Sequence, residues 1–122
     1  MPPAVRALRG ATTVDTDTAE QVTGRVQTLV SRMLEDNGVA HEDVISILFT
    51  ATEDVTSMFP ATAARAIGLG DVPLICAREL SVDGGTPLCI RVMMHLTTDR
   101  PRDQLHHVYL EGARGLRDDL PD

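Results

Sequence analysis

Val72 to Leu96 reads VPLICARELSVDGGTPLCIRVMMHL, and this stretch decides the fold. The pattern predicts two strands joined as a hairpin, with the glycines after Asp83 supplying positive-φ positions for the turn. Both faces of the second strand are largely apolar, since it alternates between Leu88, Ile90, Val92 and Met94 on one side and Cys89, Arg91, Met93 and His95 on the other. A strand that is apolar on both faces is predicted to lie in the middle of a sheet.

Arg91 stands in the middle of this predicted central strand, where its side chain does not easily reach water. A buried guanidinium is costly unless an anion meets it. One possible partner is a protein carboxylate, such as Glu79 on the neighbouring strand. The other is an anionic ligand. Periodicity alone leaves both possibilities open.

Composition limits the classes of protein to consider. A chain of 122 residues is predicted to form one domain, residues 1–122, for which an oligomer interface would add stability. Its net charge of -7 argues against nonspecific nucleic-acid binding. The core is predicted to be aliphatic, because the aromatic residues are only Phe49, Phe59 and Tyr109.

All eleven basic residues are arginine, which the codon usage of a GC-rich genome explains well. Any bound anion must nevertheless meet guanidinium groups, which pair with carboxylates through two hydrogen bonds. Cys76 and Cys89 are predicted to be packing residues and not a disulfide framework. No apolar run has membrane-spanning length and MPPAVRALRG lacks the core of a signal peptide, so a cytoplasmic location is expected.

Taken in order, the chain predicts α+β architecture, a mixed sheet backed by helices. The first strand covers Ala4 to Ala11, and the simplest interpretation of Arg9 is a solvated residue on an edge strand. The next elements are a helix from about Asp17 to the stop signal Asn37–Gly38, a buried strand from Val44 to Ala51, and a short helix that begins at Pro60 and ends at Gly68 or Gly70.

After Asp99–Pro101 the spacing of Leu105, Val108, Tyr109 and Gly112 predicts a last helix. Neighbouring helical residues point to different faces, so His106 and His107 are not expected to form a metal site. No Ser-His-Asp or Cys-His pairing indicates covalent catalysis, and the glycines at 84–85 do not form a phosphate loop. Residues 116–122 are predicted to be a loosely held tail.

Five fragments together resemble the trimeric, monofunctional chorismate mutases of bacteria. Each fragment alone is weak, but their order and spacing over nearly the whole chain make the likeness specific. They are RGATTV at Arg9–Val14, FPATAAR at Phe59–Arg65, CARE at Cys76–Glu79, CIRVMM at Cys89–Met94 and HVYLEGARGLR at His107–Arg117.

The resemblance implies a homotrimer whose three sheets enclose a pseudo-α/β barrel, with active sites between subunits. It also implies the rearrangement of chorismate to prephenate, in aromatic amino-acid biosynthesis. In this reaction one carbon–oxygen bond breaks while a carbon–carbon bond forms, so no cofactor, metal, proton transfer or nucleophile is expected. Catalysis would come from positioning and from donors aimed at the ether oxygen, where negative charge develops.

The resemblance also assigns roles to individual residues. Arg91 is expected to hydrogen-bond the ether oxygen and a carboxylate, Arg9 and Tyr109 to bind a carboxylate, and Glu79 to accept the ring hydroxyl. The expected substrate-binding residues are Cys76 as a further polar contact, Arg65 as an additional site arginine, Phe59, Ala61, Leu74 and Ile75 as apolar walls, and Leu116 and Arg117 as the covering tail.

Two details depart from a simple transfer of the family pattern. Strict alternation puts Cys76 and Glu79 on opposite faces of their strand, so a bend near residues 77–78 is predicted to bring both to one site. After FPA this chain has Thr62 where a lysine is expected, which leaves Arg65 and Arg117 to attract the dianion.

The alternative function is a trimeric small-molecule-binding or regulatory module of this architecture without catalysis.

Overall fold

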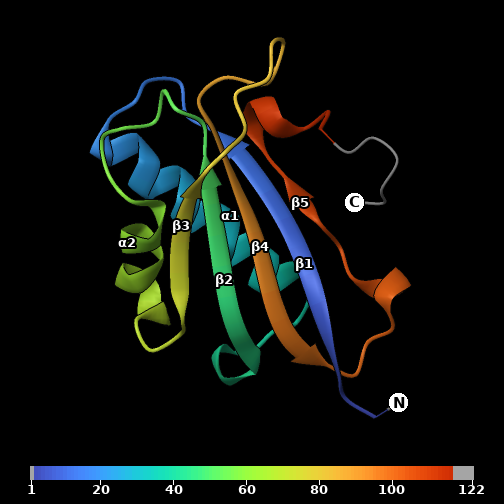
Figure 1. Cartoon of the computed structure of the whole chain (residues 1–122). Coiled ribbons are helices and arrows are strands. Elements are labelled where there is room, and N and C mark those ends of the chain that lie inside the picture. Colours follow the sequence, from blue (N-terminus) through green and yellow to red (C-terminus); the bar gives the residue numbers. More distant parts are fainter. Residues whose placement is uncertain (1, 117–122) are drawn as a thin grey trace.

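The computed structural model describes residues 2–116, and Figure 1 views its sheet from the uncovered face, with the long helix behind it. Within these residues five strands form one mixed sheet in the order β3-β2-β4-β1-β5. The elements are β1 (Ala4–Thr13), α1 (Ala19–Asp36), β2 (Val44–Ala51), α2 (Pro60–Ala64), β3 (Leu74–Arg78), β4 (Cys89–Thr98) and β5 (Val108–Tyr109), with short turns η1 (His41–Asp43), η2 (Arg65–Leu69), η3 (Arg102–Gln104) and η4 (Glu111–Ala113). The predicted α+β class is confirmed.

Strand β4 lies in the middle of the sheet, as predicted, because it pairs antiparallel with β1 on one side and β2 on the other. Its residues Ile90, Val92 and Met94 are buried in the core with the apolar face of α1. Arg91 and Met93, on the opposite side of the strand, are only half-buried. The sheet therefore has one face covered by α1 and one open face, and Arg91 belongs to the open face.

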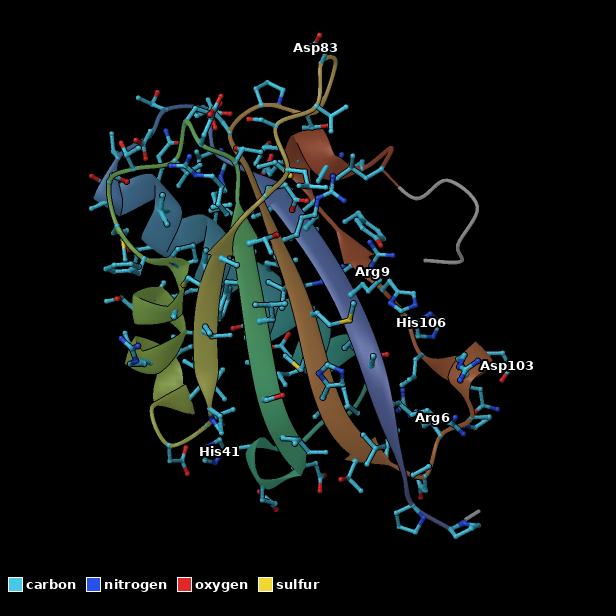
Figure 2. All side chains as sticks on the ribbon, viewed as in Figure 1. Arg6, Arg9, His41, Asp83, Asp103 and His106 are labelled. Carbon is cyan, nitrogen blue, oxygen red and sulfur yellow. The ribbon has the colours of Figure 1, made fainter. Side chains whose placement is uncertain are left out.

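The predicted hairpin between the strands of Val72–Leu96 is wrong. Strand β2 lies between β3 and β4, and it pairs parallel with β3 and antiparallel with β4. Residues 79–88 are long enough to cross over the end of β2, and their tip, marked by Asp83 in Figure 2, points away from the sheet. The expected turn does form there, since Gly84 has a φ of 81°. A Gly-rich connection indicates a reversal of direction but does not determine which strands become neighbours.

Helix α1 agrees with its sequence signals at both ends. Thr18 caps its start by accepting a hydrogen bond from the Gln21 main-chain N–H at 3.1 Å, and Gly38 takes the left-handed φ of 60° after Asn37. Its buried residues recur at helical spacing: Val22, Val26, Leu29, Val30 and Met33. Among the described residues, no helix is both long and apolar enough to cross a membrane.

Gly10 allows α1 to approach β1 closely. A Cβ atom at this position would lie 2.5 Å from Met33 Sδ and 3.1 Å from Leu29 Cδ1. A larger residue would therefore force the side-chain ends of Met33 and Leu29 to shift. The absence of a side chain at position 10 leaves room for Met33 and Leu29 directly behind the strand segment that carries Arg9.

Asp17 anchors the loop between β2 and α2. Its carboxylate accepts hydrogen bonds from the main-chain N–H groups of Thr56 at 2.9 Å and Ser57 at 3.1 Å. These bonds, with that from Thr56 the largest cause, lower the pKa of Asp17 to about 2. The carboxylate is thus ionised at neutral pH and holds the loop that leads to Phe59 and the start of α2 at Pro60.

The predicted last helix is wrong. Residues 102–104 form the single turn η3, the chain then runs extended into β5, and η4 follows. Strand β5 pairs parallel with β1 through Gly10↔Val108 and Ala11↔Tyr109, and the Leu110 N–H donates to Ala11 O at 2.9 Å. The side of β1 that does not pair with β4 is free to bind residues 108–109, and this pairing replaces the helix that the spacing predicts. The prediction that Arg9 lies on an edge strand is therefore wrong, because β1 lies between β4 and β5.

Candidate active site

A cavity of about 190 Å³ on the open face of the sheet contains all four predicted catalytic residues. Arg9 comes from β1, Arg91 from β4, Tyr109 from β5 and Glu79 from the residue after β3. They belong to four segments that are far apart in the sequence. The sheet order brings these segments together. The strands β4, with Arg91, and β1, with Arg9, lie between β3, which Glu79 follows, and β5, with Tyr109.

Arg91 is neither free in solvent nor fully neutralised. Its side chain is 35% exposed, and its Nε lies 3.5 Å from Glu79 Oε2. That separation is within ion-pair distance, but the geometry makes no hydrogen bond, and within residues 2–116 the buried Nε atom has no hydrogen-bond partner. Glu79 is thus the nearby carboxylate that the sequence suggested, yet it leaves a donor of Arg91 unused beside a cavity.

Tyr109 has a similar unused group. Its hydroxyl oxygen is buried and makes no hydrogen bond to any other part of the described chain, although the ring lines the same cavity as Arg91. Buried polar groups in proteins are nearly always paired, and those without a partner call for an explanation. Two such groups in one small cavity indicate that it is shaped for a polar ligand.

Glu79 is held in place by β2. Its main-chain N–H donates to Ala51 O at 2.9 Å, and the Thr50 hydroxyl donates to Glu79 Oε2 at 2.6 Å. Thr50 also faces Arg91 directly across the β2–β4 pairing and lines the cavity. Sequence reasoning missed Thr50. The available signal was a hydroxyl residue near the end of a strand that is otherwise mostly apolar.

The predicted bend near residues 77–78 is wrong. The β2–β3 pairing is regular from Ile47↔Leu74 to Ala51↔Arg78, so the alternation continues. Cys76 pairs with the buried Phe49 and packs against the core, whereas Glu79 reaches the open face. A β-bulge needs one extra, unpaired residue in the strand. The regular pairing of β3 with β2 leaves none, so Cys76 and Glu79 point to opposite faces of the sheet.

Cys76 and Phe59 line a second, larger cavity of about 460 Å³ between β3 and the 52–60 loop. Phe59 is 71% exposed there. In one chain the predicted site residues are therefore divided between two cavities. The smaller cavity contains the four predicted catalytic residues, and the larger one contains the exposed ring of Phe59 together with Glu53 and Arg78.

The other predicted binding residues that the structure describes lie outside both cavities. Ala61 is buried in the core and Leu74 packs against it, while Ile75 is 65% exposed on β3. Arg65 is exposed at the end of α2, and Leu116 is half-buried. Arg117 lies outside the described residues.

The thiol of Cys89 is neutral at physiological pH. Burial raises the pKa of Cys89 above its ordinary value, with the positive charge of Arg91 acting in the opposite direction. This agrees with its predicted role as a packing residue. Cys76 and Cys89 are both free thiols.

The fold and the site define a class of protein. It is a small α+β protein with a pocket on an open sheet face, and this pocket presents two arginines, one glutamate and a tyrosine. Arginine pairs with carboxylates through two hydrogen bonds, so the pocket suits a small molecule that carries carboxylate groups.

Comparison with known proteins gives a consistent result. The family model described as chorismate mutase type I matches residues 5–120. The chain is 49% identical to the chorismate mutase AroH of Thermus thermophilus, over 95% of this chain and 96% of that protein, and 45% identical to that of Bacillus subtilis, over 95% and 92%. A solved chorismate mutase from Clostridium thermocellum superposes with a TM-score of 0.88 at 45% identity, covering 90% of this chain and 98% of the other.

The chain belongs to the type I chorismate mutase family. The prediction of a chorismate mutase, an isomerase of aromatic amino-acid biosynthesis, is confirmed. The five sequence fragments were thus sufficient to recognise the family without the fold.

Proposed function

We propose that this protein rearranges chorismate to prephenate in the cavity formed by Arg9, Glu79, Arg91 and Tyr109. Arg91 donates to the ether oxygen and to a carboxylate, and Arg9 and Tyr109 bind a carboxylate. Glu79, oriented by the Thr50 hydroxyl at 2.6 Å, accepts the hydrogen bond of the ring hydroxyl. The reaction only redistributes bonds within one molecule, so these groups need to bind, orient and stabilise charge.

The observation that carries this proposal is the pair of buried, unused donors, Arg91 Nε and Tyr109 Oη, at one cavity. A substrate with two carboxylates and an ether oxygen offers acceptors for both. The cavity lining has two arginines and one glutamate, which leaves one unmatched positive charge. This excess favours an anion in a protein whose net charge is -7.

The proposal predicts that purified protein converts chorismate to prephenate without any added cofactor. Both compounds would be followed in the same sample by absorbance and by liquid chromatography, after dialysis against a metal chelator. An enzyme-free sample gives the uncatalysed rate. Protein that binds chorismate but leaves it unchanged would contradict the proposal and favour the noncatalytic binding module.

We also propose that the active unit is a homotrimer of single-domain subunits, with sites between neighbouring subunits. Large apolar side chains remain uncovered on strands of the open sheet face, including Val5, which is 63% exposed, and Ile75, at 65%. A neighbouring subunit that packed on this face would remove these side chains from water, which favours association. The cytoplasmic location expected from the sequence stays a prediction.

The separation of the two cavities supports sites that are shared between subunits. In one chain, Phe59 and Cys76 line a different cavity from Arg91. A site that combines the smaller cavity of one subunit with the larger cavity of the next would bring Phe59 and Cys76 to Arg91. Chorismate carries two negative charges and the smaller cavity has one unmatched positive charge, so a second cation would come from Arg78, which lines the larger cavity, or from Arg65 or Arg117.

The trimer predicts that Val5→Glu lowers the oligomeric state. Val5 is far along β1 from the cavity residues and is 63% exposed in a single chain, so the change has little effect on the isolated fold. At an interface it would place a charge among apolar groups. The matched control is Ile67→Glu on η2, 38% exposed, which should remain trimeric. Sedimentation equilibrium measures both, and a wild-type monomer would refute the arrangement.

A further inference from the structure

His107 contacts the strand that carries Arg9. The main-chain N–H of Arg9 donates a hydrogen bond to His107 Nδ1 at 2.9 Å. The pairing between β1 and β5 covers only Gly10↔Val108 and Ala11↔Tyr109. Arg9 and His107 each precede this pairing by one residue. A longer ladder would give the Arg9 N–H a main-chain carbonyl as its acceptor, and here the imidazole nitrogen of His107 accepts instead.

The direction of this hydrogen bond determines the state of the ring. A main-chain N–H can only donate, so Nδ1 must supply the lone pair. The imidazole is therefore neutral, with its proton on Nε2. Only a side chain with an acceptor at the Nδ1 position can make the same bond.

The segment that carries His107 is fixed to the end of α1 by Asn37. Asn37 Nδ2 donates to His106 O at 2.9 Å, and the His106 N–H donates to Asn37 Oδ1 at 2.6 Å. Asn37 is itself 1% exposed and also donates to Met33 O at 2.8 Å. Figure 2 labels Arg9 on β1 and His106 on the chain that leads into β5. The helix end thus sets where the His107 ring can lie.

We propose that His107 is a positioning residue for the rearrangement, which acts through Arg9. Held by the Asn37 contact to His106, the ring fixes the main chain of Arg9 where β5 begins. This sets the distance between the guanidinium of Arg9 and the hydroxyl of Tyr109, which both line the cavity. The role rests on the proposed function, because it concerns how these two groups meet one substrate.

The test compares three substitutions at position 107. Asparagine places a carbonyl oxygen near the position of Nδ1, glutamine places its amide nearer to Nε2, and leucine offers no acceptor. His107→Leu is expected to raise KM for chorismate about 3- to 10-fold, the effect of losing one hydrogen bond, with a smaller change in kcat. His107→Asn should remain near wild type, and His107→Gln should resemble the leucine variant.

The same substitutions in an Arg9→Ala background separate positioning from a general effect on the fold. If His107 acts through Arg9, His107→Leu adds no further increase in KM once the Arg9 side chain is gone. An increase of the same size in both backgrounds, or no increase in either, would overturn the proposal. Where the leucine variant does not fold, the asparagine and glutamine variants give the same comparison.

A second readout does not depend on turnover. Hydrogen exchange of the Arg9 amide, followed by NMR, should be slow in wild type and His107→Asn and faster in His107→Gln. Equal exchange in the last two would overturn the positioning contact. Wild-type protein without chorismate turnover would instead refute the proposed function, so the two failures can be told apart.

Discussion

Arg91→Lys is expected to lower kcat for chorismate by about 10²- to 10³-fold, the usual effect of removing one donor that stabilises charge in a transition state. Lysine keeps the positive charge but loses the planar set of donors that can reach an ether oxygen and a carboxylate together. Arg91 Nε is buried and makes no hydrogen bond within residues 2–116, so this donor is available to the substrate. KM should change less, since charge on the ether oxygen develops only as the bond breaks.

The matched control is Arg32→Lys. Arg32 lies on α1, where it forms an i,i+4 ion pair with Asp36 at 3.2 Å and is 49% exposed. The same chemical change there should leave kcat within about two-fold, because exposed ion pairs contribute little. An Arg91→Lys protein with wild-type kcat would show that this guanidinium does not stabilise the transition state.

Phe49→Ala is expected to lower the free energy of unfolding by about 3–5 kcal/mol, the typical effect of truncating a buried aromatic residue. Phe49 is fully buried at the centre of β2, where it faces Val92 on β4 and Cys76 on β3. It is the largest of the fully buried side chains in the part of the chain that the structure describes. Denaturant titration followed by circular dichroism would measure the loss at a fixed protein concentration.

Ile67→Ala provides the comparison, since it truncates an apolar side chain that is 38% exposed on η2, away from the proposed interface. Its effect on the free energy of unfolding should stay below about 1 kcal/mol. Similar losses for the two variants would mean that Phe49 is not the packing centre of the sheet. The fixed protein concentration matters because the stability of an oligomer depends on it.

Elements with local signals were predicted well. Val44–Ala51 has the same bounds in the sequence pattern and in β2, helix α1 stops at Asn37–Gly38, and α2 begins at Pro60. Each of these boundaries depends on residues that are close together in the chain, such as a capping group or a run of apolar side chains. Such signals act before any long-range contact forms, so they can be read without the fold.

The failures all concern contacts between distant segments. The hairpin of Val72–Leu96 and the last helix were wrong because β2 enters between β3 and β4, and because β1 offers an edge to residues 108–109. The bend was wrong because pairing with β2 keeps β3 regular. Local periodicity contains no information about which edge a strand will meet.

The candidate site also depends partly on local sequence signals and partly on contacts between distant segments. The sequence alone determined that Arg91 is held in the middle of a sheet and needs an anion, since alternation and the cost of burying a guanidinium are local matters. Only the tertiary structure decided that Thr50 orients Glu79, that Cys76 belongs to a different cavity, and that His107 holds the main chain of Arg9. These relations depend on strand order and on side-chain direction across the sheet, which exist only once the distant strands have paired.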